Sequence, residues 1–242
     1  VATPNIILNT AVAEALSQFA KELEGTAPED MEHAVHELIK RAIKKHKKVI
    51  FNGNGYTEEW VEEAKKRGLY NLESTPDCLP QFISDKNVEL FTKHHIFTKE
   101  EIFSRYEILL ENYVKTIGIE AKTMKEMLTK DFLPAVSSYA AFVSDNALAM
   151  KALAPSVPTA SAESLVSSLG DAYEKISSAL STLDEEIQEI DKKGSMQESA
   201  DYCHKTVLAT MDELRAAADE AEAKIPDEEL PYPTYDALLF SV

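Results

Sequence analysis

The sequence predicts an all-α fold: a helical bundle with a long antiparallel coiled-coil hairpin near the C-terminus. Three observations support this prediction. Only 7 of the 242 residues are glycine, and the β-branched residues do not alternate with polar ones as they would in strands. Apolar residues instead recur every three or four positions, which is typical of amphipathic helices. Between residues 165 and 221, two heptad patterns flank a short turn.

Composition places the chain among globular proteins, because 44% of its residues are hydrophobic and 28% are charged. Its length is typical of one or two domains. The formal net charge is −17, and most of the excess acid lies late in the chain: residues 1–160 carry −4 and residues 161–242 carry −13. Nucleic acids and anionic membranes bind proteins through clusters of positive charge. Because this chain is strongly acidic, we expect no nucleic-acid partner and no membrane partner.

Several features bear on where the protein resides. No apolar run approaches the ~18 residues of a membrane-spanning helix, and the first residues lack the basic segment of a signal peptide. The two cysteines, Cys78 and Cys203, lie far apart in the sequence and suggest a reducing cytoplasm. The chain begins with Val1 rather than Met, and residues 6–20 have the pattern of a packed helix. We therefore expect a fragment of a longer cytoplasmic protein.

The first helix is expected over residues 5–23, where apolar residues recur at helical spacing and Gly25 follows as a C-terminal stop. A second helix should open at Pro28, because proline fits the first turn of a helix. The two acidic residues that follow favour the positive end of the helix dipole. The run of lysines within residues 44–48 suits the negative end.

The next segment holds several short elements. We expect an extended run at residues 49–51, a turn at 52–56, a helix at 57–68, a loop at 70–74 and short helices over 75–91. Asn and Gly in the turn tolerate positive φ angles. Thr57 is the expected N-cap of its helix and Gly68 the stop. Thr75, followed by proline, should cap the next helix.

Two longer helices follow. Thr98 is the expected N-cap of the first, because two glutamates come within the first turn after it. A longer helical stretch runs from residue 120 to about residue 153. It should kink at Pro134, which cannot donate a backbone hydrogen bond. Residues 154–158 (APSVP) are the clearest linker in the chain.

The pattern after this linker is a strict heptad repeat. Its apolar positions are Leu165, Leu169, Tyr173, Ile176, Leu180, Leu183, Ile187 and Ile190. A second series follows the turn at residues 193–195: Met196, Ala200, Cys203, Val207, Thr210, Leu214, Ala217 and Ala221. Two matched series joined by a turn predict an antiparallel helical hairpin with arms of about 33 Å. The apolar tail that ends the chain should dock on the body or on a partner.

Two groups of residues invite a catalytic interpretation. The Asn-Gly-Asn-Gly segment at residues 52–55 precedes a helix, but a phosphate loop requires a Gly-Lys-Ser/Thr ending. Glu58 and Glu59 would also repel phosphate, so we interpret this segment as a turn. His33 and His36 lie one helical turn apart, yet the zinc-hydrolase spacing is absent and no third ligand is placed. Surface histidines are the favoured interpretation, and a metal-dependent enzyme is the weakest alternative.

Other candidates are also better explained by structure. His94 and His95 are adjacent, so they point in different directions on a helix. Cys203 precedes His204, but it falls on the heptad seam, where a free cysteine acts as a small apolar residue. The glutamates within residues 185–189 lack the Glu-x-x-His motif of di-iron bundles.

One basic cluster stands out: Lys40, Arg41, Lys44, Lys45, Lys47 and Lys48. It could bind an acidic partner, such as the acidic hairpin of a neighbouring subunit, although a solvated helix end is the favoured interpretation. No Ser/His/Asp or Cys/His arrangement has supporting context. We therefore expect no catalytic, cofactor-binding or metal-binding residue in this chain.

Several segments together resemble type III glutamine synthetases. They are residues 4–16 (PNIILNTAVAEAL), 49–64 (VIFNGNGYTEEWVEEA), 66–69 (KRGL), 75–77 (TPD), 105–108 (RYEI), 119–121 (IEA) and 233–240 (PTYDALLF). The first of these resembles the helix that ends the catalytic domain of that family. The similarity runs the length of the chain and is weakest across residues 155–200. Each motif alone has little specificity, but the set is specific.

The resemblance implies the C-terminal region of an ATP-dependent glutamate–ammonia ligase, an enzyme that uses Mg²⁺ or Mn²⁺. It also implies that the family's metal ligands, ATP contacts and substrate arginines precede Val1. This chain alone should therefore not catalyse. Family members form two stacked hexameric rings, so the implied partners are the catalytic domain and neighbouring subunits. The expected parts are a truncated terminal helix of the catalytic domain (1–25), a helical body (26–154), a helical hairpin (155–225) and a docking tail (226–242).

Two functions from different classes follow. The favoured one is a non-catalytic fragment of a glutamine synthetase, with a structural, oligomerisation or regulatory role. The alternative is a stand-alone acidic helical adaptor that binds a basic protein partner.

Overall fold

A computed structural model describes residues 2–240, and all the regular secondary structure in that range is helical. The prediction of an all-α fold is confirmed. The chain divides into two compact units, residues 1–109 and residues 110–242, and the division falls within helix α6 (Lys99–Met127). Among the residues described, no helix is both long enough and apolar enough to cross a membrane. The four-part division expected from the sequence stays a prediction, and its terminal residues 1 and 241–242 lie outside the described range.

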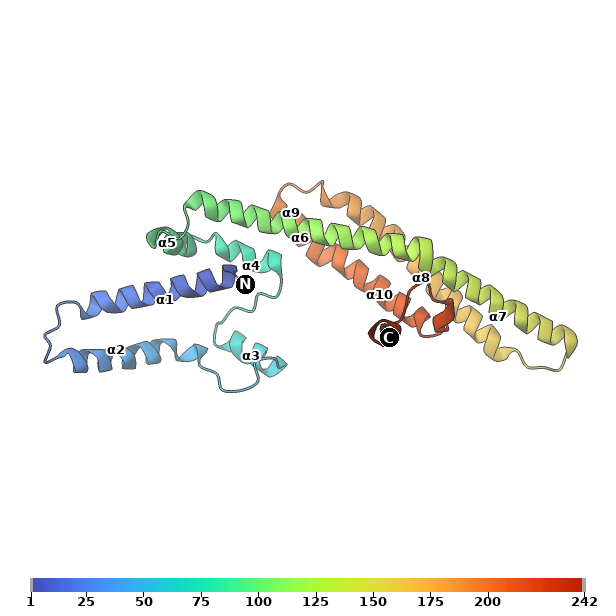
Figure 1. The fold of residues 1–242 in the computed structure, drawn as a ribbon, viewed down its shortest axis with the longest axis horizontal. Helices are drawn as coiled ribbons and strands as arrows, with labels where there is room; N and C mark the ends of the chain where they lie inside the picture. Colours follow the sequence, from blue (N-terminus) through green and yellow to red (C-terminus); the bar gives the residue numbers. More distant parts are fainter. Residues whose placement is uncertain (1, 241–242) are drawn as a thin grey trace. The chain divides into compact units, whose positions relative to one another are not determined.

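The first unit is built from helices and turns (Figure 1). They are α1 (Ala2–Leu23), α2 (Met31–His46), the 3-10 turn η1 (Lys47–Val49), α3 (Glu58–Lys66), α4 (Thr75–Phe82), α5 (Asp85–Lys93) and the beginning of α6. Helices α1 and α2 run antiparallel in Figure 1. Gly25 and Gly68 follow α1 and α3 with φ angles of 83° and 68°, a left-handed conformation that favours glycine. Both predicted helix stops are confirmed.

Three local expectations in this unit need correction. Helix α2 begins at Met31 rather than at Pro28, because Ala27 to Asp30 form a turn closed by a 3.0 Å bond from the Asp30 amide to the Ala27 carbonyl. Proline suits the second position of such a turn as well as it suits a helix start. The extended run expected at residues 49–51 is replaced in part by η1, which ends at residue 49.

The third correction concerns the start of α4. Ser74, one residue earlier than expected, is its N-cap and accepts a 3.2 Å bond from the Asp77 amide. Thr98 caps α6 as predicted: its hydroxyl accepts from the Glu101 amide at 3.2 Å. The Glu101 carboxylate in turn accepts from the Thr98 amide at 2.8 Å. This reciprocal pair is a capping box, which satisfies two backbone donors at the helix start.

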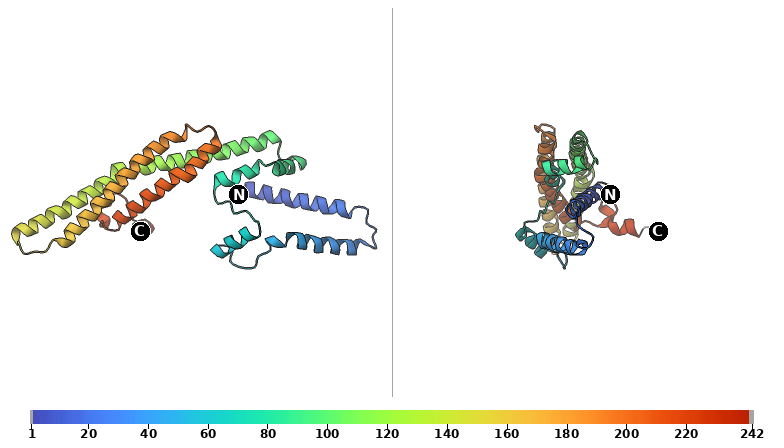
Figure 2. Two further views of the ribbon diagram at one scale, coloured as in Figure 1. Left: turned by 180° about the vertical axis from the view of Figure 1, so that it is seen from behind. Right: turned by 90° about the vertical axis from the view of Figure 1, so that its left-hand side faces the viewer.

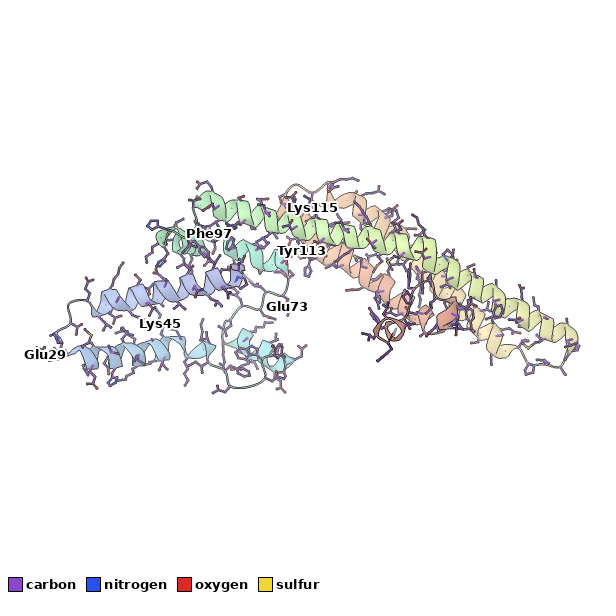
Figure 3. The ribbon with its side chains drawn as sticks, viewed as in Figure 1. Glu29, Lys45, Glu73, Phe97, Tyr113 and Lys115 are labelled. Carbon is purple, nitrogen blue, oxygen red and sulfur yellow. The ribbon has the colours of Figure 1, made fainter. Side chains whose placement is uncertain are left out.

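The core of the first unit includes three aromatic rings. Phe91 is 2% exposed, and its ring lies 5.6 Å from the rings of both Phe82 and Phe97. Arg105 places its guanidinium 4.5 Å from the centre of the Phe97 ring, which covers that ring with a cation. The cluster joins α4, α5 and the first turns of α6. Phe97 is labelled in Figure 3.

The second unit is a bundle of long helices. It contains the rest of α6, the π-helical turn η2 (Leu128–Phe132), α7 (Leu133–Leu153), α8 (Ala160–Ile190), α9 (Met196–Tyr202), the π-helical turn η3 (Cys203–Val207), α10 (Leu208–Glu222), the 3-10 turn η4 (Asp227–Glu229) and α11 (Tyr235–Leu239). Helix α8 packs on α7 and on α10 (Figure 2, left). The loop after Leu153 matches the predicted linker.

The two helices expected at 98–113 and 120–153 are nearly continuous, because residues 114–119 are also helical. A π-turn lies directly before Pro134, at the place where a kink was expected. Proline cannot donate to the carbonyl four residues earlier, and its ring crowds that carbonyl. A wider turn relieves both problems without ending the helix.

Packing between α8 and α10 buries residues of both predicted heptad series. The fully buried ones include Leu169, Ile176 and Leu183 on α8, and Cys203, Val207 and Leu214 on the returning arm. At the turn, the Ser199 hydroxyl donates a 3.0 Å bond to the Ile190 carbonyl. The returning arm contains the π-turn η3, which the heptad pattern did not predict. That the two arms supercoil around each other stays a prediction.

The tail reaches the bundle through Tyr232. Its hydroxyl donates to the Asp131 carboxylate at 2.8 Å and lies 3.1 Å from the Met127 carbonyl. Burial and the neighbouring Asp131 carboxylate raise the pKa of Tyr232 to about 12. Beyond it, Leu239 and Phe240 are each 75% exposed. The tail is therefore attached at Tyr232, whereas its apolar end is open.

We expect the change Tyr232→Phe to loosen this tail by about 1 kcal/mol, because it removes one hydroxyl and leaves the ring in place. Hydrogen exchange of residues 230–240 should become faster, and limited proteolysis should release the tail sooner. Tyr70→Phe is the control, since Tyr70 is 82% exposed. Equal tail protection in both variants would show that the hydroxyl does not hold the tail.

Candidate functional site

Helix α1 presents its polar side to the rest of its unit. Thr10 is its buried residue, 3% exposed, and its hydroxyl donates a 2.7 Å bond to the Ile6 carbonyl of the same helix. One turn later, Glu14 faces the end of α5. At about 100° per residue, both residues lie on the side of α1 opposite Val12.

Glu14 is the centre of a polar cluster between α1 and α5. Its carboxylate accepts a 2.6 Å bond from Lys93 and a 2.7 Å bond from Gln18, and its second oxygen lies 2.6 Å from His94 Nε2. The bonds from Lys93, Gln18 and His94, in that order, lower the pKa of Glu14 from 4.5 to about 2. These contacts attach α1 to α5 through charge and hydrogen bonds.

The stabilising effect of this cluster should depend on pH. Because the pKa of Glu14 is lowered on folding, its contribution to stability is present above pH 4.5 and is lost as the pH falls toward 2. We expect Glu14→Gln to reduce the fall in melting temperature between pH 5 and pH 2. Glu24→Gln removes the same charge just beyond α1 and serves as the control. If both variants follow the unaltered protein, the cluster contributes nothing to stability.

The opposite side of α1 is apolar and open. We call Leu8, Val12, Leu16 and Phe19 the outer stripe; they are 65%, 57%, 60% and 36% exposed. Their spacing of 4, 4 and 3 residues places them on one face. A surface helix ordinarily turns its apolar stripe toward the core of its own domain. Here the polar face is turned inward, so the outer stripe is a candidate interaction surface.

The Asn-Gly segment after α2 is held by packing, in agreement with its interpretation as a turn. The Phe51 ring stacks on Trp60 at 4.0 Å, and the Arg67 guanidinium lies 5.5 Å from the centre of the same Trp60 ring. Arg67 also donates a 2.9 Å bond to the Ile50 carbonyl. A side chain at Gly53 would come within 2.5 Å of the Phe51 ring and would displace that ring from Trp60.

The candidate ligands and cations of α2 are exposed. His33 and His36 both face solvent, and among the side chains that the structure describes no group of three or more His, Cys, Asp or Glu residues comes together that could hold a metal ion. All six residues of the basic cluster are exposed too. Within it, Arg41 pairs with Glu22, and Lys40 lies 3.2 Å from Glu37. Lys45 is labelled on α2 in Figure 3.

The two histidines at the end of α5 have different surroundings. His94 faces Glu14, whereas His95 adopts a left-handed φ of 53° just beyond the helix.

Burial raises the pKa of the Cys203 thiol to about 11. At neutral pH this thiol is protonated, so it is a poor nucleophile beside His204.

The glutamates of α8 have separate roles. Glu189 binds Lys192 at 2.6 Å, whereas Glu186 points into the seam and accepts a 2.9 Å bond from the Thr210 hydroxyl. The second carboxyl oxygen of Glu186 is buried and has no hydrogen-bond partner among the residues described. Burial raises the pKa of Glu186.

A cavity of about 530 Å³ lies beside the tail, between α6 and α10. Apolar side chains dominate its wall, among them Met124, Met127 and Met211, and Tyr232 closes one side. Neither this cavity nor the Glu14 cluster could be identified from the sequence. The one feature of the sequence that could have indicated the Glu14 cluster is that Glu14 is an acidic residue among small and apolar residues.

Comparison with known proteins gives a consistent result. The family model described as the glutamine synthetase C-terminal domain matches residues 34–151. A glutamine synthetase of Butyrivibrio fibrisolvens is 47% identical over 91% of this chain, and the type-3 glutamine synthetase of Dictyostelium discoideum is 32% identical over 98%. A glutamine synthetase of Bacteroides fragilis is 26% identical over 98%. The chain spans about a third of the length of these relatives: 32%, 33% and 33%.

Proposed function

Because this chain belongs to the glutamine synthetase family, we propose that it is the non-catalytic C-terminal part of an ATP-dependent glutamate–ammonia ligase. One observation carries this proposal: similarity to glutamine synthetases extends over 91–98% of the chain but only about a third of each relative. The remaining two thirds of such a protein would hold the active site. The role of this part is then structural, through oligomerisation, or regulatory.

The full-length protein would use ATP and Mg²⁺ or Mn²⁺. The side chains described by the structure do not fit such a metal, since no three or more His, Cys, Asp or Glu residues among them come together. The buried carboxylate of Glu186 faces a threonine hydroxyl and not other ligands. We therefore place no step of the reaction on these residues, and assign them to the framework around the catalytic part.

The partners that fit this proposal are the catalytic part of the same polypeptide and neighbouring subunits of a double-ring assembly in the cytoplasm. The two units offer different surfaces for such contacts. The first exposes apolar residues on α1, whereas residues 161–242 carry a net charge of −13.

The test compares the full-length protein with this chain. The full-length protein should form glutamine from glutamate, ammonia and ATP in the presence of Mg²⁺. A variant that lacks residues 110–242 should lose the assembly size measured by light scattering. This chain alone should form no glutamine and bind no ATP by calorimetry.

Two results would overturn the proposal. One is a full-length protein without ligase activity under these conditions. The other is a natural polypeptide of the length of this chain that captures a basic protein in a salt-sensitive manner. That second result would support the acidic adaptor instead.

A further inference from the structure

We infer that the cavity between α6 and α10 binds a small organic molecule with an apolar body and a positively charged amine. This inference goes beyond the proposed function and does not depend on it, since it concerns one cavity of the second unit and its lining. Three segments form the cavity: residues 119–132, residues 211–222 and the tail residues 230–235. A bound molecule would therefore contact two long helices and the tail at once.

The first argument is the size and the lining of the cavity. Its volume of about 530 Å³ falls within the range of ~300–1,000 Å³ that is typical of small-molecule sites. Three methionines, Met124, Met127 and Met211, belong to its largely apolar wall. Methionine side chains are flexible and polarisable, so such a wall adapts to ligands of different shapes. The cavity therefore suits the apolar body of a small organic ligand.

The second argument is the backbone around the cavity. Leu128 and Phe132 are the first and last residues of the π-turn η2, and both line the cavity. Turns of this kind inside long helices are frequent at functional sites. Tyr232 lines the cavity as well, and its hydroxyl is bonded to the Met127 carbonyl and the Asp131 carboxylate. Specific hydrogen bonds thus hold one wall of the cavity against the π-turn.

The third argument is the charge at the rim of the cavity. Among the described side chains that line it, the charged ones are Glu120, Arg215, Asp219 and Glu222, and all four are exposed. Arg215 donates a 2.7 Å bond to Asp219, so these two charges offset each other. The carboxylates of Glu120 on α6 and Glu222 on α10 remain. Residues 161–242 also carry a net charge of −13, so the surroundings attract a cation and repel an anion.

Aromatic rings add to this preference for a cation. Phe132, Tyr232 and Tyr235 all line the cavity, and the face of an aromatic ring attracts positive charge. A protonated amine can therefore lie against a ring and pair with a carboxylate of the rim. An anionic ligand would meet the same carboxylates as repulsion. The lining thus favours an apolar amine over an apolar acid.

Two probes with the same rings and opposite charges test the inference. Naphthylethylamine is protonated at neutral pH, whereas naphthylacetate is ionised, and binding of each to this chain is measured by titration of naphthyl fluorescence. We expect the amine to bind at least tenfold more tightly than the acid. Ethylamine, which has the charge without the rings, should fail to displace the naphthyl amine at equal concentration.

A bulky substitution at the cavity locates the bound amine. Thr123 is exposed and lines the cavity, so Thr123→Trp should fill part of the space and weaken amine binding at least tenfold. Thr116→Trp makes the same change at an exposed position of α6 outside the lining, and it is the matched control. Both variants should keep the circular dichroism and melting temperature of the unaltered chain, because both threonines are exposed.

Neutralising the rim tests the origin of the charge preference. Glu120→Gln combined with Glu222→Gln should lower the preference for the amine over the acid at least fivefold. Glu174→Gln combined with Glu185→Gln removes two exposed carboxylates of α8 outside the lining and controls for net charge. An equal loss of preference in both double variants would contradict a specific role of the rim.

Hydrogen exchange gives a second readout of the position of the amine. Because tail residues form one wall, saturating naphthylethylamine should slow exchange of residues 230–240 at least threefold. Naphthylacetate at the same concentration should leave this exchange unchanged. Unchanged exchange with the amine bound would mean that it lies away from the tail, which contradicts the inference.

Four further results would overturn the inference. Absence of amine binding at about 1 mM, or an affinity no greater than that of the acid, excludes this class of ligand. Equal binding by Thr123→Trp and Thr116→Trp places the amine elsewhere. If a chain shortened after residue 235 binds the amine at least tenfold more tightly, the apolar end of the tail is the occupant. An amine affinity that falls as the protein concentration rises would make a second copy the occupant.

Discussion

Replacing Leu183 by alanine is expected to lower the free energy of unfolding of the second unit by about 3 kcal/mol. Leu183 is 0% exposed and lies in the last third of α8, a helix that packs on α7 and on α10. The change removes three carbon atoms from a closely packed seam and leaves a cavity that long helices cannot easily close. The midpoint of thermal unfolding should fall by about 10 °C.

The measurement is urea or thermal unfolding followed by circular dichroism, with hydrogen exchange to assign the loss to residues 110–242. Leu153→Ala makes the same chemical change at a side chain that is 90% exposed. It should shift stability by less than about 0.5 kcal/mol. Similar effects of the two substitutions would mean that α8 does not pack as the structure shows.

Phe91→Ala should have an effect of about 3–5 kcal/mol on the first unit. The ring is 2% exposed and contacts two other aromatic rings at 5.6 Å, so its loss removes both buried area and the ring contacts. The end of α5 also carries Lys93 and His94, which hold α1. Hydrogen exchange should therefore accelerate in α1 as well as in α4 and α5.

Tyr56→Ala is the aromatic control in the same unit, because Tyr56 is 99% exposed. It should leave both unfolding and exchange almost unchanged. A double variant of Phe91→Ala and Leu183→Ala should show the sum of the two losses, since each residue belongs to a separate core. Faster exchange of residues 110–242 in the single variant Phe91→Ala would show instead that the two units unfold as one.

Much of the helical framework could be predicted because its signals are local. The left-handed glycines at 25 and 68 end their helices, and Thr98 forms its capping box with a residue three positions away. Five of the eight heptad positions on α8 are buried, and the other three, Leu165, Tyr173 and Ile187, are half-buried. These features depend on residues within one or two turns, so sequence patterns identify them.

Other features depend on residues that the sequence does not bring together. Glu14 and His94 are 80 positions apart, and nothing in either segment indicates that they meet. The backbone can accommodate a proline in more than one way, as a turn at Pro28 and as a π-turn before Pro134. The packing of neighbouring residues decides which of these forms. The orientation of α1 also depends on residues that are distant in the sequence, so it could not be predicted. An amphipathic pattern reveals that a face is apolar, but not which protein segment covers it.

The contact between Glu186 and Thr210 sets the alignment of the two arms of the hairpin. Sliding α10 by one helical turn along α8 would move Thr210 by about 5.4 Å, beyond the reach of a hydrogen bond. Both carboxyl oxygens of Glu186 would then lie unpaired in an apolar seam. Leucines and alanines repeat along the arms and would tolerate such a slip, whereas this pair, whose threonine is buried, would not. Like a lone asparagine in a leucine zipper, it gives up some stability so that only one register is acceptable.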